Sequence, residues 1–136
     1  MDKKELENNW KRALADYRNL EKRVAEEREM FFTFANSSLV LRILPILDNL
    51  ESLVKHVDDE GLKMTIKDFK RILDEEGVKE IEAEGKDFDA ELMEAIEKVE
   101  GAKDKVVEVL QKGYTMKEKI LRPARVKVGS GKEQHA

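Results

Sequence analysis

Apolar residues recur along the first part of the chain at alternating steps of four and three, and this spacing constrains the fold most. The residues between them are mostly Lys, Arg, Glu and Asn. Such a repeat places the apolar side chains in one stripe along a helix, which is the seam of a coiled coil. The seam comprises Leu6, Trp10, Ala13, Tyr17, Leu20, Val24, Phe31 and Phe34.

This stripe needs a partner, because it would otherwise be exposed to water. No other segment of the chain is long enough to cover it, so we expect two copies to pair along it as a closed twofold dimer, in parallel. Glu27 occupies the next position of the series, and Trp10 and Tyr17 fill a tight two-stranded seam poorly. The sequence therefore predicts a coiled-coil stalk over residues 1–38 that is loosely packed.

From Leu39 onward the apolar face becomes too wide for one partner helix to cover. A second amphipathic run follows Gly61 and ends near Gly77, which indicates a helical hairpin over residues 39–76. Pro45 lies inside the helical pattern and predicts a bend. Two such hairpins, one from each copy, would form a four-helix bundle at the dimer interface. The expected dimer contacts are Leu6, Leu20, Val24 and Phe34 in the stalk, and Ile43, Leu47, Leu50 and Val54 in the bundle.

After Gly77 the helical period fades, and short segments rich in Val and Ile appear between glycines. Residues 78–83, 106–111 and 120–128 are predicted to be strands, and residues 90–96 a short helical turn. We expect a small C-terminal β-domain over residues 77–128 and a flexible tail over residues 129–136. The predicted fold class is α+β, with a long N-terminal helix in a parallel dimeric coiled coil, a four-helix bundle and this β-domain.

Composition argues against several classes of function. The chain has 26 basic and 30 acidic residues and a net charge of -4, so no basic face for nucleic acid or an anionic membrane is expected. No segment approaches the roughly 20 apolar residues of a membrane span. The absence of cysteine fits a cytoplasmic protein. No nucleophile stands with a base and an orienting group, so we expect no enzyme, no catalytic residue, no cofactor, no metal and no small-molecule substrate.

Several segments together carry a family resemblance. Residues 88–96 read FDAELMEAI, and Gly113-Tyr114, Glu118 and residues 121–128, LRPARVKV, follow them. Residues 16–23 read DYRNLEKR, and residues 43–50 read ILPILDNL. In this order and spacing they resemble the GrpE family, the nucleotide exchange factors of DnaK-type chaperones. The resemblance covers nearly the whole chain, although many members begin with a long acidic segment and the helical pattern here starts almost at Met1.

The resemblance implies a co-chaperone that acts as a dimer on one chaperone molecule. It would bind the ATPase domain of a DnaK-type chaperone, open its nucleotide cleft and promote ADP release. Because the seam is poor, we also expect activity to fall on heating as the stalk melts. The alternative is a dimeric coiled-coil scaffold or adaptor without exchange activity, which explains the first half equally well but leaves the C-terminal segments unexplained.

The resemblance also implies partner contacts in the loop of residues 112–119. Gly113 would make its turn, Met116 would be an apolar contact and Lys119 a charged contact. An ordinary hairpin whose apolar residues are simply core is an equally good interpretation of any one of them. Arg122 is a further contact or, alternatively, anchors its strand. Gly61 between the bundle helices is a further expected contact, or alternatively only a helix start. Lys22 and Arg23 in the stalk complete the expected partner-binding residues, although solvated flanks of the seam are the better interpretation of both.

Overall fold

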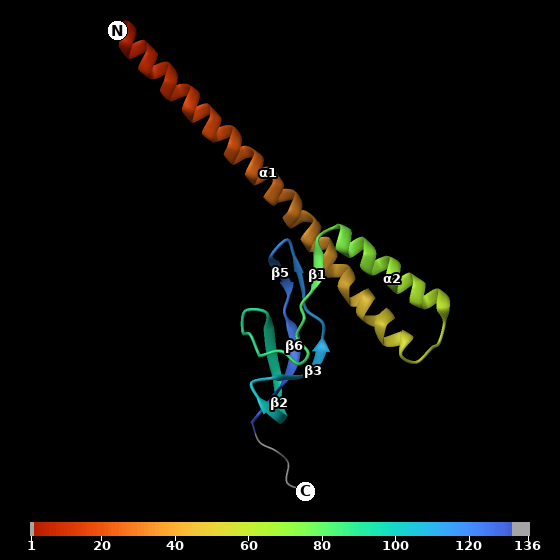
Figure 1. Ribbon diagram of the computed structural model, residues 1–136. Coiled ribbons are helices and arrows are strands. Elements are labelled where there is room, and N and C mark those ends of the chain that lie inside the picture. Colours follow the sequence, from red (N-terminus) through yellow and green to blue (C-terminus); the bar gives the residue numbers. More distant parts are fainter. Residues whose placement is uncertain (1, 132–136) are drawn as a thin grey trace. The chain divides into compact units, whose positions relative to one another are not determined.

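The computed structural model describes residues 2–131 of the chain (Figure 1). Its contacts divide the chain into two compact units, Met1–Leu39 and Val40–Ala136. The first helix, α1 (Lys3–Val54), runs through both units, and α2 (Glu60–Glu75) follows it in the second. The long N-terminal helix and the C-terminal strands confirm the predicted α+β fold class, whereas pairing of two chains remains a prediction.

Helix α1 continues without interruption through Pro45. Asp2 starts it, because its carboxylate accepts a hydrogen bond from the backbone N–H of Glu5 at 2.8 Å. By length and composition alone, α1 contains a stretch apolar enough to cross a membrane. The expectation that no segment approaches a membrane span was therefore too strict, although a core helix of a soluble protein passes the same test.

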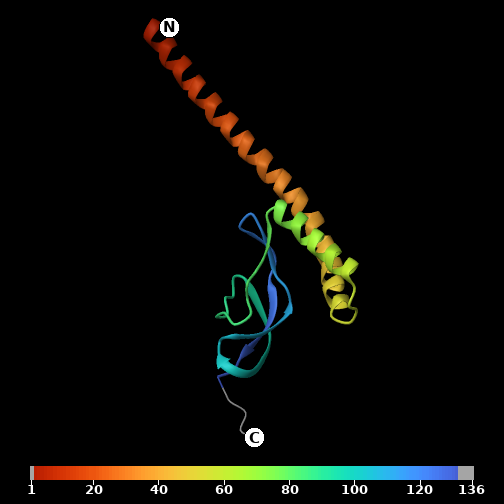
Figure 2. The same cartoon turned by 45° about the vertical axis from the view of Figure 1, so that its right-hand side comes forward.

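Helix α2 begins at its N-cap, Asp59, whose carboxylate accepts from the backbone N–H of Leu62 at 3.2 Å. Its apolar side chains fall on one face, where Ile66 and Leu73 are buried. Figures 1 and 2 both show α2 alongside the C-terminal part of α1. These two segments form a helical hairpin.

The remaining chain forms two three-stranded sheets, ordered β1-β4-β5 and β2-β6-β3. In the first sheet both pairings are antiparallel. In the second, β2 is parallel to β6, and β3 is antiparallel to it. The strands are β1 (Val78–Glu80), β2 (Met93–Lys103), β3 (Val106–Gln111), β4 (Tyr114–Met116), β5 (Lys119–Arg122) and β6 (Ala124–Gly129).

Three details differ from the sequence-based predictions. The strand expected over residues 120–128 is two strands in different sheets, separated by Pro123, which has no N–H to donate. The turn expected at residues 90–96 is confined to residues 90–92, where Met93 N–H donates to the carbonyl of Asp89 at 2.8 Å, because β2 begins at Met93. Of the expected tail, Gly129 ends β6, and Ser130 donates to the carbonyl of Val99 at 2.8 Å. Residues 132–136 lie outside the described part of the chain.

The second unit contains two apolar cores. One buries side chains of α1, α2 and the sheet β1-β4-β5 together, comprising Val40, Leu44, Leu47, Ile66, Leu73, Val78, Tyr114 and Met116. The other lies in the sheet β2-β6-β3 and the segment before it, comprising Ala83, Met93, Val106, Ala124, Val126 and Val128. The first sheet thus shares its core with the helical hairpin.

Candidate partner-binding surface

The turn between β4 and β5 is the exposed end of the predicted loop. Its two central residues, Lys117 and Glu118, have φ angles of 46° and 70°. Positive φ at both centres matches a tight hairpin turn that usually uses Asn and Gly. Such a conformation is uncommon for Lys and Glu, and backbone strain of this kind gathers at functional sites. Lys119 follows at the start of β5 with an exposed side chain, so the β4–β5 turn (residues 117–119) presents charged groups to solvent.

The two other predicted contacts in this loop are buried. Met116 is 1% exposed and packs in the core that joins the helices to the first sheet, so the structure corrects its assignment from partner contact to core. Gly113 is also buried, and a Cβ atom there would lie 2.3 Å from the backbone nitrogen of Ala124. Glycine is therefore required because two backbone segments meet, and not because a partner approaches.

Arg122 is held inside the protein. Its Nη1 and Nη2 atoms each lie 2.7 Å from a different carboxylate oxygen of Asp48 on α1. Its Nε donates to the carbonyl of Lys112 at 2.8 Å, and its guanidinium lies 5.3 Å from the centre of the Tyr114 ring. The Arg122 side chain is 11% exposed. Of the two interpretations left open by the sequence, the structure supports strand anchoring.

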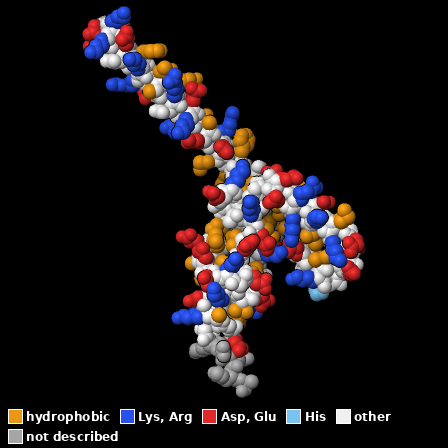
Figure 3. All heavy atoms as spheres, in the orientation of Figure 1, with side chains coloured by type: hydrophobic (Ala, Val, Ile, Leu, Met, Phe, Trp, Pro, Cys, Tyr) orange, Lys and Arg blue, Asp and Glu red, His pale blue; other side chains and the backbone are white. Residues whose placement is uncertain are grey.

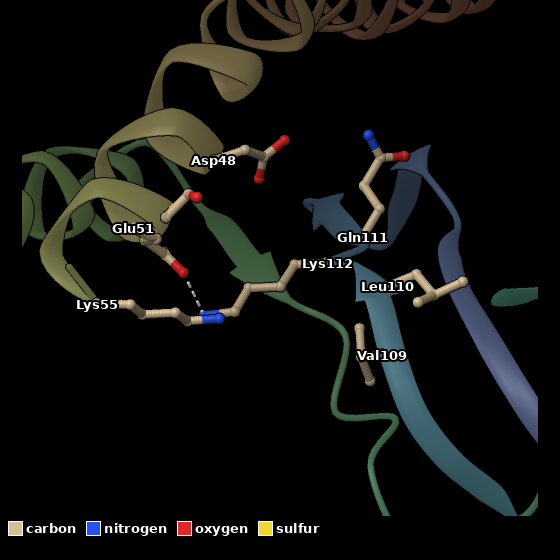
Figure 4. Close-up of a pocket in the computed structure, with 8 residues that line it drawn as sticks. Asp48, Glu51, Lys55, Val109, Leu110, Gln111 and Lys112 are labelled. Atoms are coloured by element: carbon tan, nitrogen blue, oxygen red, sulfur yellow. Dashed lines mark ion pairs between the residues drawn. The ribbon is translucent and has the colours of Figure 1, made fainter.

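A second charged contact lies one helical turn further along α1 (Figure 4). The Glu51 carboxylate lies 2.6 Å from Nζ of Lys112, and its other oxygen lies 3.3 Å from Nζ of Lys70 on α2. The Lys112 ammonium also reaches Glu80 of β1 at 3.4 Å. We call the two pairs Asp48–Arg122 and Glu51–Lys112 the junction clamp, because the first joins α1 to β5 and the second joins α1 to the connection between β3 and β4.

Burial and charge act oppositely on Lys112. Burial alone lowers the pKa of Lys112, but the hydrogen bond and charge of Glu51, with the charge of Glu80, raise the pKa above its ordinary value. The ammonium therefore stays protonated at neutral pH. Burial also raises the pKa of the Tyr114 hydroxyl, and the carboxylates of Glu51, Glu80 and Asp48 raise it further, so Tyr114 stays neutral.

The other predicted contacts are exposed but lie elsewhere. Gly61 is in the first turn of α2, where a Cβ atom would approach the capping carboxylate of Asp59 to 3.1 Å. Lys22 and Arg23 lie on the first unit, and Arg23 is 4.0 Å from Glu27 in an exposed pair. Such pairs contribute little to stability. The structure thus groups Gly113, Met116, Lys119 and Arg122 around the first sheet, and only Lys119 of these is exposed.

The predicted dimer contacts divide into two classes. In the first unit, Leu6, Leu20, Val24 and Phe34 are all exposed, and Figure 3 shows apolar side chains at the surface along this helix. In the second unit, Leu47 is fully buried within its own chain, while Ile43, Leu50 and Val54 are half-buried against the same core. Leu47 cannot contact a second copy, because its own chain already covers it. The apolar side chains that α1 leaves exposed in the second unit include Ile46 and Leu53.

No group of three or more acidic, His or Cys side chains that could hold a metal occurs within the described residues. A cleft of about 310 Å³ opens beside the junction clamp, lined by α1 and by residues 109–112 (Figure 4). Its walls carry the paired charges of Asp48, Glu51 and Lys112, so these groups are engaged in holding the fold.

Comparison with known proteins decides the family. The GrpE family model matches residues 1–130. The chain belongs to the GrpE family. The protein GrpE of Lactobacillus johnsonii is 39% identical over 137 residues, which cover 92% of this chain and 71% of that protein. The protein GrpE of Parageobacillus thermoglucosidasius is 40% identical over 136 residues, covering 92% of this chain and 61% of that protein.

Membership of the GrpE family confirms the resemblance and supports the co-chaperone role that it implies. A cytoplasmic location is compatible with the family and stays a prediction. The sequence reasoning missed the junction clamp, above all Asp48, Glu51 and Lys112. A signal was present, because Asp48 is a charged residue inside the apolar segment ILPILDNL, and a charge that lies among core residues needs a partner.

Proposed function

We propose that this GrpE-family chain is a nucleotide exchange factor. It binds the ATPase domain of a DnaK-type chaperone, holds the nucleotide cleft open and so promotes ADP release. The observation that supports this proposal most is the family match over residues 1–130, which includes both helices and both sheets. The exposed β4–β5 turn, whose sheet shares a core with the helical hairpin, supports a contact surface there.

The mechanism is a shift of population. An exchange factor must bind the open, empty chaperone more tightly than the closed one, and each tenfold shift requires about 1.4 kcal/mol of differential binding. By reciprocity, a bound nucleotide weakens the grip on the chaperone by the same factor. The chain itself therefore needs no catalytic group, and ATP binding by the chaperone releases it.

The first test is release of a fluorescent ADP analogue from a DnaK-type chaperone, followed by stopped flow. We expect the chain to accelerate release at least tenfold, and Lys119→Ala to raise the half-maximal concentration about tenfold, the effect of losing one good charged contact. Lys98→Ala, an exposed lysine of β2, is the matched control and should change nothing. A folded protein that leaves the release rate unaltered would refute the proposal and favour a scaffold or adaptor.

We further propose that the chain acts as a parallel homodimer. The support is the exposed apolar stripe of α1 in the first unit, where Leu6, Leu20, Val24 and Phe34 recur along the helix. A single helix with such a stripe is covered when a second copy lies beside it. The three predicted segments would then have different roles. The stalk of residues 1–38 would pair two chains, the hairpin of residues 39–76 would form the four-helix bundle, and the β-domain of residues 77–128 would bind the chaperone.

Heating should inactivate the dimer before it unfolds the second unit. Glu27 and the bulky Trp10 and Tyr17 make the stalk seam weak, so the helix of the first unit should melt first. We expect circular dichroism to show two separate losses of helix and the rate of ADP release to fall with the first. A single sharp transition that includes all the helical signal would contradict this prediction.

A further inference from the structure

The junction clamp connects two segments that the sequence presents as unrelated. Asp48 belongs to α1, and Arg122 ends β5, 74 residues later in the chain. Both arms of the guanidinium pair with the carboxylate at 2.7 Å. A bidentate pair of this kind specifies direction as well as distance, because both hydrogen bonds lie in one plane.

The second pair of the clamp, Glu51–Lys112, restricts the rotation that the first pair leaves free. Glu51 lies three residues after Asp48, on the same side of α1, and its partner Lys112 lies just before β4. Nε of Arg122 donates to the carbonyl of Lys112, so the two pairs are themselves connected. Two linked contacts restrict rotation about either one and add directional bonds to the apolar core, whose hydrophobic driving force is without direction.

We propose that Arg122 and Asp48 are positioning residues, which fix the β4–β5 turn in one orientation on α1 so that it meets its partner already ordered. The inference rests on the proposed exchange function, because it assigns the turn as the part that binds the chaperone. Arg122 acts through Asp48 and makes no contact with the partner. Without the clamp the β4–β5 hairpin adopts several orientations on α1. Only molecules in the binding-competent orientation bind the chaperone, so the apparent affinity is the intrinsic affinity multiplied by the fraction of molecules in that orientation.

Arg122→Lys tests this role most directly. Lysine keeps the positive charge but cannot reproduce the planar fork. We expect the half-maximal concentration for ADP release to rise about tenfold, while the maximal release rate stays within twofold. The maximal rate is kept because a variant molecule that has bound the chaperone with its β4–β5 turn in the right orientation still promotes ADP release normally. Arg125→Lys is the matched control: Arg125 lies on β6 and is an exposed partner of Glu94 at 3.9 Å. It should leave both values unchanged.

A distance measurement tests the positioning without the chaperone. The chain has no cysteine, so spin labels attached at Glu118→Cys and Lys67→Cys report only on the β4–β5 turn and α2. Labelled chains are mixed with an excess of unlabelled chains so that only distances within one chain contribute. We expect one narrow distance distribution in the parental chain, a broad one with Arg122→Lys, and a narrow one with Lys119→Ala, which removes a contact and leaves the clamp intact.

The outcomes separate this inference from the proposed function. If the parental chain does not accelerate ADP release, the exchange function fails while the distance distributions still decide the positioning. If Arg122→Lys unfolds, as amide exchange across β5 would reveal, Asp48→Asn replaces it, because the amide keeps the shape and loses the charge. A narrow distribution at the parental distance in a folded clamp variant, or an unchanged half-maximal concentration, overturns the inference.

Discussion

Leu47→Ala should lower the free energy of unfolding of the second unit by about 3 kcal/mol, the usual loss when a buried leucine is truncated and its cavity does not collapse. The Leu47 side chain is 0% exposed and belongs to the core that joins α1, α2 and the first sheet. The loss is therefore expected within one chain and does not depend on a second copy.

Urea unfolding followed by circular dichroism at two protein concentrations measures this effect. We expect Leu47→Ala to displace both unfolding curves by the same free energy. The neighbouring Ile46 is 53% exposed and supplies the control Ile46→Ala. Its effect on the free energy of unfolding should depend on protein concentration, because Ile46 would contribute mainly to the association of two chains. If Leu47→Ala instead left the unit as stable as before and only dissociated dimers, the original assignment of Leu47 as a dimer contact would be right.

The second large effect is expected from Ile46→Lys combined with Leu53→Lys, which should weaken dimerisation at least 100-fold. Ile46 and Leu53 are seven residues apart and are 53% and 47% exposed, so they lie on one uncovered side of α1 beside its core face. Burying such side chains contributes about 1.5 to 3 kcal/mol each, and a lysine in their place would be buried without a partner. A 100-fold change corresponds to about 2.8 kcal/mol.

Sedimentation equilibrium gives the dissociation constant for this comparison. Val107→Lys is a control of the same chemistry, because Val107 is an apolar residue of β3 that is similarly exposed. It should leave dimerisation unchanged. An unaltered dissociation constant in the Ile46 and Leu53 double variant would place the bundle interface on another face of the hairpin.

Local patterns were sufficient for much of this protein. The helix that carries Leu6 to Phe34, the second helix near Gly61 and the strand from Val106 were predictable, because helix period and strand propensity depend on neighbours in sequence. The family resemblance was also visible in the sequence, because short segments in a fixed order carry it. Strand β2 was missed because its residues are mostly exposed on both faces, so no alternation marks it.

Only the tertiary structure decided which side chains are buried and which remain exposed. Leu47 and Ile46 are adjacent apolar residues in one helical run, yet one is buried under its own chain and the other remains exposed. Met116 and Arg122 end the two strands that flank the β4–β5 turn and were expected to bind a partner, yet the apolar core buries Met116 and Asp48 pairs with Arg122. Sequence by itself determined the two helices, the strand from Val106 and the family motif, because local spacing controls these. The roles within the site depend on contacts between residues far apart in the chain, which appear only when the fold brings them together.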